Sequence, residues 1–434
     1  MSCVPQEILD LIIDCLHDDT AALKSCSLAH RSFLFSTRIY LFREFTAYSA
    51  KNASSAAKLH TDARTLANFA QFLVESRNIC DYIQSLTVYG RTQDAPTPFF
   101  VRTHALVSIL ARLPRLRELC LHSVCLLAAN FEEELKVIRS HQHAFSIRGI
   151  KLSQSAFRSG PEDKSLYGSP FSDLLSTFSR VDTLSLDIHG AISSLFHSNL
   201  TDELGQLPSR TSVTAIVATA FPLAVRGEVN PYLSQTIDLS GVRTLHTKLV
   251  HPVYNYNIKE TSIFLQYPSL SLAELHLDMT KFHFVDTFYQ EMLLSHLTPP
   301  TIPCTSLESL TLSAEISRIS QPLAWEVLTT FLSRFLQSPL TSLTYLNLRI
   351  HIAVSTAPGI SLLLAKDLQM DPLRQALEFS KRLRKLDIVF VEEEVSSAGI
   401  VPDTWKEWIK KIETHFQEGL AELCDRGLVT VRVA

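Results

Sequence analysis

The sequence predicts an α/β protein: a short three-helix module at the amino terminus, then a solenoid with parallel strands inside and helices outside, closed by a capping helix. Three observations support this fold class. An apolar stripe at helical spacing runs through the first 45 residues. An L-x-x-L-x-L element returns about every thirty residues along the rest of the chain. Helical patterns of apolar residues separate its copies.

Composition restricts the classes of function. The chain has 434 residues, with 40 Lys and Arg against 44 Asp and Glu, which leaves a formal net charge of −4. A net charge this close to neutral does not predict a surface that binds nucleic acid, because such surfaces are strongly basic. Because 46% of the residues are hydrophobic and 19% are charged, the chain can bury a large core and is not expected to be disordered.

The sequence predicts no membrane segment. The longest uncharged runs, 212–225 and 351–365, are shorter than the roughly 18 apolar residues that a span needs, and a proline interrupts each. Acidic residues stand at the amino terminus, where a signal peptide would be basic and then apolar. The 8 cysteines form no CxxC pair, as expected of reduced, buried thiols. We therefore expect a cytoplasmic or nuclear protein, or one found in both compartments.

Residues 1–45 are expected to form the helical module. In 5–17, Ile8, Ile12 and Leu16 recur every four residues, which places them along one helix face. A break at 17–20 precedes a second helix at about 21–29, and a third segment rich in large apolar residues follows. So short a segment cannot bury all of these side chains internally, so some must face a partner or the next domain.

This opening resembles an F-box. The segments VPQEILDLIIDCL, LKSCSLAHRSF and IYLFREF follow the F-box pattern, which begins Leu-Pro-x-Glu-Ile with Ile and Leu one and two turns later, and look most like F-box proteins of mushroom-type fungi. Val4 replaces the first Leu, and Phe33 stands where Trp is common. The matching positions are Pro5, Glu7, Ile8, Ile12, Leu16, Leu23, Cys26, Ser27, Leu28, Arg31 and Phe33.

The resemblance implies a trihelical module that docks the Skp adaptor, and through it a cullin, in a Skp–cullin–F-box ubiquitin ligase. An alternative is that these helices only cap the exposed end of the solenoid, with the same stripe turned inward. In the first case adaptor binding is assigned to the apolar residues of the module and the proline before its first helix: Val4, Pro5, Ile8, Leu9, Ile12, Leu16, Leu28 and Phe33.

Residues 46–60 are small and polar and are expected to be a linker before a solenoid at 61–434. The repeated element begins at Ile83, Leu116, Ile147, Val181, Val213, Val242, Leu272, Leu307, Leu343 and Leu383. Successive starts lie between 29 residues (Val213 to Val242) and 40 residues (Leu343 to Leu383) apart. So regular a spacing indicates a repeat architecture.

One strand and one helix per repeat is the leucine-rich-repeat arrangement, here longer than the usual length and without the usual Asn after the strand. We therefore expect an irregular leucine-rich-repeat-like solenoid, with an α/β fold of the same strands as the alternative. After Pro402, residues 403–425 are expected to form the closing cap. The helices expected between strands are 68–82, 103–113, 131–141, 171–178, 285–297, 323–336 and 373–379.

Alternation along the strands predicts the binding surface. If Leu275 and Leu277 point into the core, then Glu274, His276 and Asp278 point to the concave face. The same register also places Thr311, Ser313, Lys385 and Asp387 there, and makes His246 and His276 neighbours. A merely solvated face is the alternative to a binding role. Target binding is assigned to Glu118, His122, Asp187, His246, Lys248, Glu274, His276, Asp278, Tyr345, Asn347 and Arg349.

No catalytic or cofactor motif is found. The sequence has no G-x-S-x-G, GxxxxGK[ST], HExxH or Rossmann pattern, and no spacing typical of a zinc site. We therefore expect no enzymatic activity, cofactor or metal, and a receptor that presents an unidentified target protein to a ligase. A plain leucine-rich scaffold is the second hypothesis, and an enzyme whose site is built from concave-face His and Asp residues is the third.

Overall fold

A computed structural model shows an α/β protein with amino-terminal helices and a large parallel sheet that does not close. The chain divides into two compact units, 1–213 with 235–237, and 214–234 with 238–434. The residues described are 4–48, 66–90, 99–129, 131–153, 156–158, 170–187, 210–219, 223–225, 228–229, 231–249, 256–267, 271–280, 287–297, 306–316, 321–337, 342–352, 370–380, 382–392 and 403–433.

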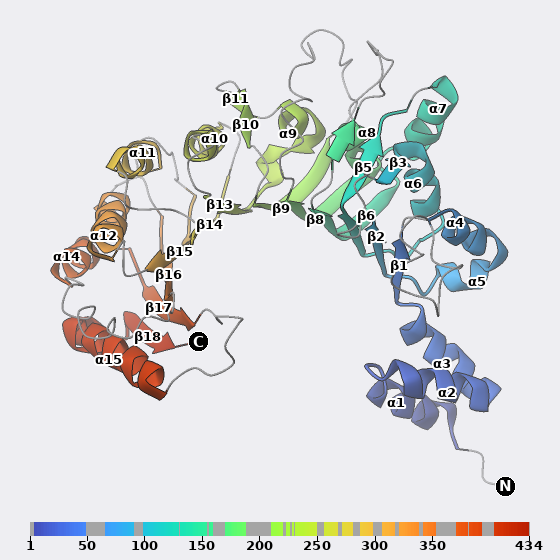
Figure 1. Ribbon diagram of the computed structural model, residues 1–434, viewed down its shortest axis with the longest axis horizontal. Helices are drawn as coiled ribbons and strands as arrows, with labels where there is room; N and C mark the ends of the chain where they lie inside the picture. The colour runs from blue at the N-terminus through green and yellow to red at the C-terminus, as the bar shows by residue number, and fades with distance from the viewer. Residues whose placement is uncertain are drawn as a thin grey trace. The chain divides into compact units, whose positions relative to one another are not determined.

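The first unit begins with a three-helix module, α1 (Gln6–Cys15), α2 (Thr20–Ala29) and α3 (Arg31–Leu41) (Figure 1). Asp19 caps α2 by accepting a hydrogen bond from the backbone N–H of Ala22 at 2.9 Å. The imidazole of His30 accepts one from the N–H of Ser32 at 3.2 Å and so caps α3. The sequence thus marks the start of both helices with a side chain that satisfies an otherwise unpaired N–H group.

Parallel strands form the sheet of the first unit in the order β1-β2-β4-β6-β8. Their bounds are Glu44–Tyr48, Ser85–Tyr89, Glu118–His122, Phe145–Ser153 and Phe178–Asp187. A second parallel sheet, β3-β5-β7, contacts helices α6 and α8. Its strands are Phe99–Arg102, Val124–Leu127 and Ala156–Arg158. The helices are α4 (Leu66–Glu75), α5 (Arg77–Cys80), α6 (Thr103–Leu110), α7 (Glu132–Ser140) and α8 (Pro170–Ser176).

The sheet of the second unit has the parallel order β9-β13-β14-β15-β16-β17-β18. Its strands are Thr211–Ala218, which begins in the first unit, Thr244–Lys248, Glu274–Met279, Ser309–Ile316, Tyr345–Ile352, Lys385–Glu392 and Val429–Val433. Strands β10 (Ala224–Val225) and β11 (Glu228–Val229) form a small antiparallel pair.

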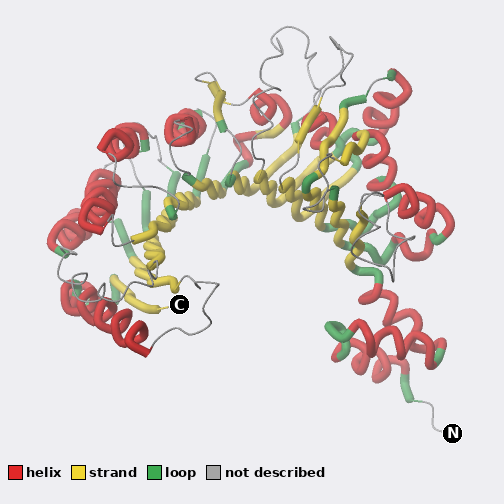
Figure 2. Tube along the Cα trace, in the orientation of Figure 1, coloured by secondary structure: helices red, strands yellow, loops and turns green. Residues whose placement is uncertain are grey.

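Helices of the second unit cover one side of its sheet (Figure 2). They are α10 (Tyr256–Leu265), α11 (Thr287–His296), α12 (Gln321–Gln337), α14 (Asp371–Phe379), α15 (Asp403–Gly419) and α16 (Ala421–Asp425). A one-turn segment, η3 (Leu239–Gly241), precedes β13. Two short elements are shared between the units: α9 (Pro231–Thr236) and strand β12 (Ile237–Asp238), of which residues 235–237 belong to the first unit. Strand β12 pairs with β9.

Leucines at alternate positions explain which side of each sheet is covered. Leu275 and Leu277 of β14 are buried, whereas Glu274, His276 and Asp278 between them are exposed or half-buried. The same alternation holds at Leu119 and Leu121 of β4. Because successive side chains point to opposite faces, the leucines pack under the helices and leave the polar residues on the other face. We call this other face of each sheet the helix-free face.

All ten repeated strands expected from the sequence are present, including the weak copies that begin at Ile147, Val213 and Val242. The seven expected helices are present as α4 with α5, α6, α7, α8, α11, α12 and α14. Helices α9 and α10 were not predicted. In the part of the chain that the structure describes, no helix is both long and apolar enough to cross a membrane.

The structure differs from the expected division of the chain at two places. The linker does not begin at residue 46, because Thr46 and Tyr48 pair with β2 as part of strand β1, and 49–60 lie outside the described residues. The expected cap at 403–425 is helical over that range but consists of two helices, α15 and α16, instead of one, and strand β18 after it adds to β17. The chain therefore adds a further strand at each end of the predicted series.

Candidate functional site

The first helix of the module packs against the third through polar side chains. Gln6 Nε2 donates a hydrogen bond to the carbonyl of Ser32 at 3.1 Å, and the hydroxyl of Ser36 donates to Asp10. One turn further, the hydroxyl of Tyr40 donates to Asp14 at 2.6 Å. The three α1 residues recur every four positions, so they share one helix face. This polar face of α1 is the face turned toward α3.

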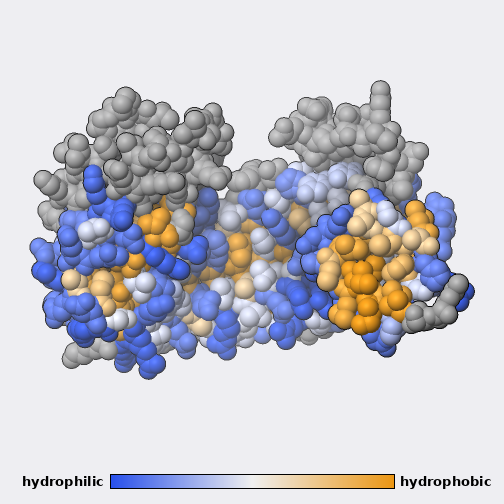
Figure 3. Space-filling view, turned by 90° about the horizontal axis from the view of Figure 1, so that it is seen from below, coloured by the Kyte–Doolittle hydropathy of each residue, from blue (hydrophilic) through white to orange (hydrophobic). Residues whose placement is uncertain are grey.

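The opposite side of α1 is apolar and exposed. At 100° per residue, Ile8 and Ile12 lie about 160° around the helix from Asp10. Their exposed fractions are 46% and 48%, and those of Val4 and Leu11 are 54% and 59%. Leu28 at the end of α2 is 88% exposed. We call these five residues the amino-terminal apolar surface. Figure 3 shows apolar side chains gathered over the three-helix module, at the right of the view.

The eight residues predicted to bind an adaptor divide into two groups. Val4, Pro5, Ile8, Ile12 and Leu28 are exposed, whereas Leu9, Leu16 and Phe33 are half-buried. The stripe expected through Ile8, Ile12 and Leu16 is therefore not uniformly exposed, because Leu16 lies nearer to the buried side, toward Ile13.

Sequence reasoning missed two exposed apolar residues of the module. Leu11 lies about 60° from Ile8 on a helical wheel, on the side away from Ile12, so helical spacing alone could have placed it at the edge of the stripe. Phe35 is 64% exposed, and its ring contacts Tyr82 edge-on at 6.0 Å between centroids. No sequence pattern could have paired Phe35 with a residue 47 positions away (82 minus 35).

The module is joined to the sheet by a short hydrogen-bonded connection. Helix α3 ends at Leu41, and strand β1 begins at Glu44. Between them, the carbonyl of Arg43 accepts hydrogen bonds from the N–H groups of Gln84 and Ser85 at 2.9 and 3.0 Å. These two bonds tie the end of the module to the start of β2.

On the helix-free face of the first unit, aromatic rings stack across neighbouring strands. The register pairs Tyr48, Tyr89 and His122 on β1, β2 and β4. The two tyrosine rings stack with 5.7 Å between centroids, and the His122 ring meets Tyr89 edge-on at 5.2 Å. Of the predicted target-binding residues, His122 and Asp187 are half-buried at the carboxyl ends of their strands, and Glu118 is exposed at the start of β4.

On the helix-free face of the second unit, the predicted register is confirmed. His246 pairs with His276, Lys248 with Asp278, and Thr311 with Asn347. The two imidazoles stack with 3.9 Å between ring centroids and 14° between planes. The ammonium of Lys248 lies 3.5 Å from the carboxylate of Asp278. Seen along the register, five side chains on consecutive strands form one line across the sheet, here called the polar row: His246, His276, Thr311, Asn347 and Asp387.

Ser313 and Asp387 correct the expectation of a uniformly exposed face, since they are only 3% and 5% exposed. His276 Nε2 lies 2.8 Å from the hydroxyl of Ser313. Asp387 accepts hydrogen bonds from the hydroxyl of Tyr345 at 2.7 Å and the ammonium of Lys385 at 3.0 Å, so the longer side chains of neighbouring rows cover it. Tyr345 and Asn347 are half-buried, and Arg349 is exposed.

The His276–Ser313 contact has the form of a base beside a nucleophile, but its environment does not suit catalysis. Burial, and then the neighbouring His246, lower the pKa of His276 to about 4, which makes the imidazole a weak base at neutral pH. Ser313 is also buried, so a substrate has no access to its hydroxyl. This geometry favours a structural role for the pair.

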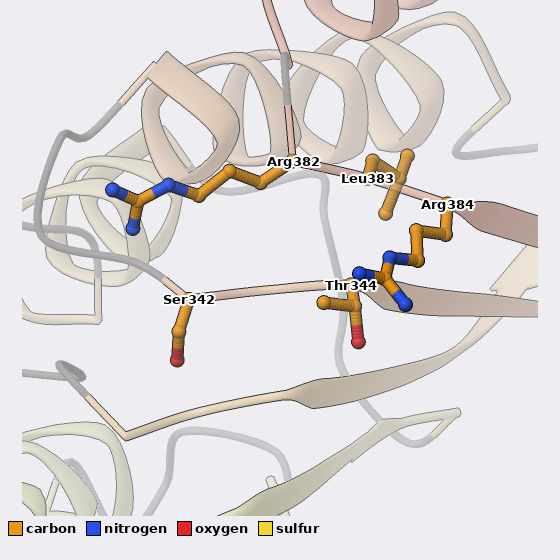
Figure 4. A pocket seen from close by; sticks show the side chains of 5 residues that line it. All are labelled: Ser342, Thr344, Arg382, Leu383 and Arg384. Atoms are coloured by element: carbon orange, nitrogen blue, oxygen red, sulfur yellow. The ribbon is translucent and has the colours of Figure 1, made fainter.

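A hollow of about 380 Å³ lies at the amino-terminal ends of β16 and β17. Its lining is Ser342, Thr344, Arg382, Leu383 and Arg384, with Arg384 turned toward Thr344 and Arg382 extending away from it (Figure 4). Two guanidinium groups and two hydroxyls offer no general base or nucleophile–base pair. Among the described residues, no group of three or more His, Cys, Asp or Glu side chains is placed to hold a metal ion.

Comparison with family models and with curated proteins gives no match. No protein-family model matches the chain, and no curated protein is similar enough to be named beside it. The resemblance of the amino-terminal segment to an F-box therefore rests on its own residues.

Proposed function

We propose that the chain is the substrate-recognition subunit of a Skp–cullin–F-box type ubiquitin ligase. The three-helix module docks a Skp-type adaptor, which in turn connects the chain to a cullin. The helix-free faces bind a target protein. The observation that carries the proposal is the amino-terminal apolar surface, in which Val4, Ile8, Leu11, Ile12 and Leu28 are about half exposed or more. A contiguous apolar surface on a small module is typical of a protein interface.

The packing of α1 supports docking over a role as cap. A cap would turn its apolar stripe onto its own chain, but the side of α1 that meets α3 carries the hydrogen-bonding residues Gln6, Asp10 and Asp14, with Ile13 buried beside them. Ile8 and Ile12 on the opposite side remain available to a partner. Fully burying one such side chain contributes about 1.5–3 kcal/mol, so a few of them supply a substantial share of a binding free energy.

Ubiquitin transfer then needs no reacting group from this chain. A receptor that holds a target close to a charged conjugating enzyme raises the effective concentration of the two reactants. The proposal accordingly assigns the chain no catalytic residue, cofactor or metal. It places the protein in the cytoplasm, the nucleus or both, where an adaptor and a cullin would meet it.

The test is adaptor co-purification with the variant Ile8→Asp/Ile12→Asp. Removing water from two carboxylates in the middle of the apolar surface has a high free-energy cost. We therefore expect the Skp-type adaptor to be lost from the purified complex. The matched control is Val74→Asp/Phe131→Asp, which adds the same charge at two exposed apolar positions outside the module, 49% and 63% exposed. Full retention of the adaptor by the module variant contradicts the proposal.

A scaffold in which the module only caps the sheet is the second candidate, and the direct passage of α3 into the edge strand β1 favours it. Deletion of residues 1–42 separates the two. A docking module can be removed with little change in thermal stability, whereas loss of a cap exposes apolar surface and causes aggregation. We expect the shortened chain to sediment without aggregates, as the full chain does, and to lose the adaptor.

A further inference from the structure

The polar row of the second unit contains buried polar atoms whose bonding capacity is unused. His246 Nε2, Asn347 Oδ1 and Asp387 Oδ1 are shielded from solvent and have no hydrogen-bond partner among the described residues. All three belong to one line of paired residues across β13 to β17. Buried polar atoms are almost always paired in folded proteins, because each unpaired one is costly. Their alignment along one row indicates a surface that is completed by a ligand.

Two of these three atoms, the Oδ1 atoms of Asn347 and Asp387, need hydrogen-bond donors from the ligand. The oxygens of Asn347 and Asp387 can only accept hydrogen bonds. Burial raises the pKa of Asp387, but hydrogen bonds from Tyr345 and then Lys385 lower it overall, which favours the ionised carboxylate. They lie on neighbouring strands, about 4.8 Å apart by the sheet spacing. An extended peptide that lies across the strands presents N–H groups and polar side chains at comparable intervals.

Two arginines beside the polar row specify an anion. In register, Arg349 of β16 and Arg432 of β18 flank Val389 of β17, about 10 Å apart by the strand spacing. Both are exposed, and neither forms an ion pair with a described residue. Burial, and then the hydrogen bond to Asp387, raise the pKa of Tyr345, and the charges of Arg432 and Arg349 oppose this rise. Both guanidinium groups therefore act on the same small region of the face.

Two lysines of this region are already paired with carboxylates. Lys248 pairs with Asp278, and Lys385 pairs with Asp387. His276, with its pKa lowered to about 4 chiefly by burial, is uncharged at neutral pH. Positive charge at this end of the face thus comes from Arg349 and Arg432, and guanidinium groups bind carboxylates through paired hydrogen bonds.

We propose that the helix-free face of the second unit binds an extended acidic segment of the target protein, with a carboxylate between Arg349 and Arg432 and N–H donors on Asn347 and Asp387. This inference rests on the proposed function, because it names the chemistry of the target that the receptor presents. It assigns Asn347, Asp387, Arg349 and Arg432 to target binding, of which Asp387 and Arg432 were absent from the sequence-based assignment.

The test uses the full chain and an array of twelve-residue peptides, each with two to four Glu at varied spacing among Ser, Gly, Ala and Leu. A second array replaces every Glu with Gln, and a third replaces it with phosphoserine. We expect the tightest Glu peptides to bind about tenfold or more tighter than their Gln counterparts, because charge-assisted hydrogen bonds are lost. Binding of these peptides should weaken as salt is raised.

The variant Arg349→Ala/Arg432→Ala should weaken binding of the Glu peptides about tenfold or more. Arg384→Ala/Arg426→Ala is the matched control, because it removes two exposed arginines of the same unit that do not flank Val389. It should change affinity less than about threefold. Asn347→Ala should weaken binding about fivefold while leaving its dependence on salt unchanged.

The inference is overturned if no Glu peptide binds, if Glu and Gln peptides bind equally, if only phosphoserine peptides bind, or if both arginine pairs behave alike. Adaptor co-purification by Arg349→Ala/Arg432→Ala is measured in parallel and should equal that of the unsubstituted chain. If the unsubstituted chain retains the adaptor but binds no Glu peptide, this inference alone is removed. Failure of the unsubstituted chain to retain the adaptor removes the proposed function instead.

Discussion

At the scale of single residues, the contacts between α1 and α3 decide which side of the module is available. Tyr40 donates its hydroxyl proton to Asp14 at 2.6 Å, and that hydrogen bond raises the pKa of Tyr40. Tyr40→Phe removes the hydroxyl and leaves the ring. We expect it to weaken the attachment of α1 by about 1 kcal/mol, measured as faster amide hydrogen exchange in α1. Exchange unchanged from that of the unsubstituted chain contradicts the polar contact described here.

The half-buried histidines of the second unit predict a dependence of stability on pH. The pKa of His276 is about 4 in the folded chain, against 6.5 for an unhindered imidazole, because burial and then His246 disfavour its charge. The unfolded chain therefore takes up the proton first as the pH falls. The stability that depends on a neutral His276 is fully present above pH 6.5 and is lost as the pH falls from 6.5 to about 4. The loss is on the order of 1 kcal/mol, since His276 is partly exposed to solvent.

Urea unfolding at pH 7.5 and at pH 5 measures this dependence. His276→Gln has no titrating imidazole, so its midpoint should change less between the two pH values than that of the unsubstituted chain. Equal changes in the two proteins would show that His276 is not held neutral.

Single residues were predictable from the sequence only where helical or strand periodicity fixes them. Ile8 and Ile12 follow from a four-residue spacing, and the His246–His276 pair follows from alternation and register. Burial of Asp387 was not predictable, because it depends on the hydroxyl of Tyr345, a residue 42 positions earlier in the chain. Local periodicity contains no information about such contacts.

At the scale of elements, the strands that the sequence revealed are those with leucine or a similar residue at the two central inward positions. Strand β1 was missed because the small Ala47 stands at its second inward position, and β18 because Arg426 stands where the repeated element begins with an apolar residue. Helix α10 was missed because YNIKETSIFL has no clear apolar stripe. Its position is set by the neighbouring elements that it contacts, among them α11.

The closing helix α15 gives a test at this scale. Phe416 is completely buried, and its ring meets Phe390 of β17 and Trp325 of α12 edge-on at 5.1 and 5.3 Å between centroids. Phe416→Ala should therefore lower the free energy of unfolding of the second unit by about 3–5 kcal/mol. Urea unfolding measures the loss, with exposed Glu418→Ala as the control within about 0.5 kcal/mol. A loss below about 1 kcal/mol for Phe416→Ala means that α15 does not cover the sheet.

At the scale of the whole molecule, the proposed receptor has two kinds of surface with different chemistry. The module presents exposed aliphatic side chains, whereas the helix-free faces present hydroxyl, imidazole and charged groups. The short connection from Leu41 to Glu44 makes the module continuous with the edge strand of its sheet. The fold class and the separation of these surfaces were predictable from periodicity, because each depends on which residues alternate. The identities of the adaptor and the target were not, because no pattern within one chain specifies its partner.

Titration calorimetry of the purified full chain with a purified Skp-type adaptor tests the central claim most directly. We predict saturable one-to-one binding with a negative change in heat capacity, because apolar surface around Ile8, Leu11 and Ile12 leaves water on association. Ile8→Asp/Ile12→Asp should abolish the heat, and Val74→Asp/Phe131→Asp should preserve it. Absence of binding by the unsubstituted chain, or equal binding by the Ile8→Asp/Ile12→Asp variant, contradicts the account.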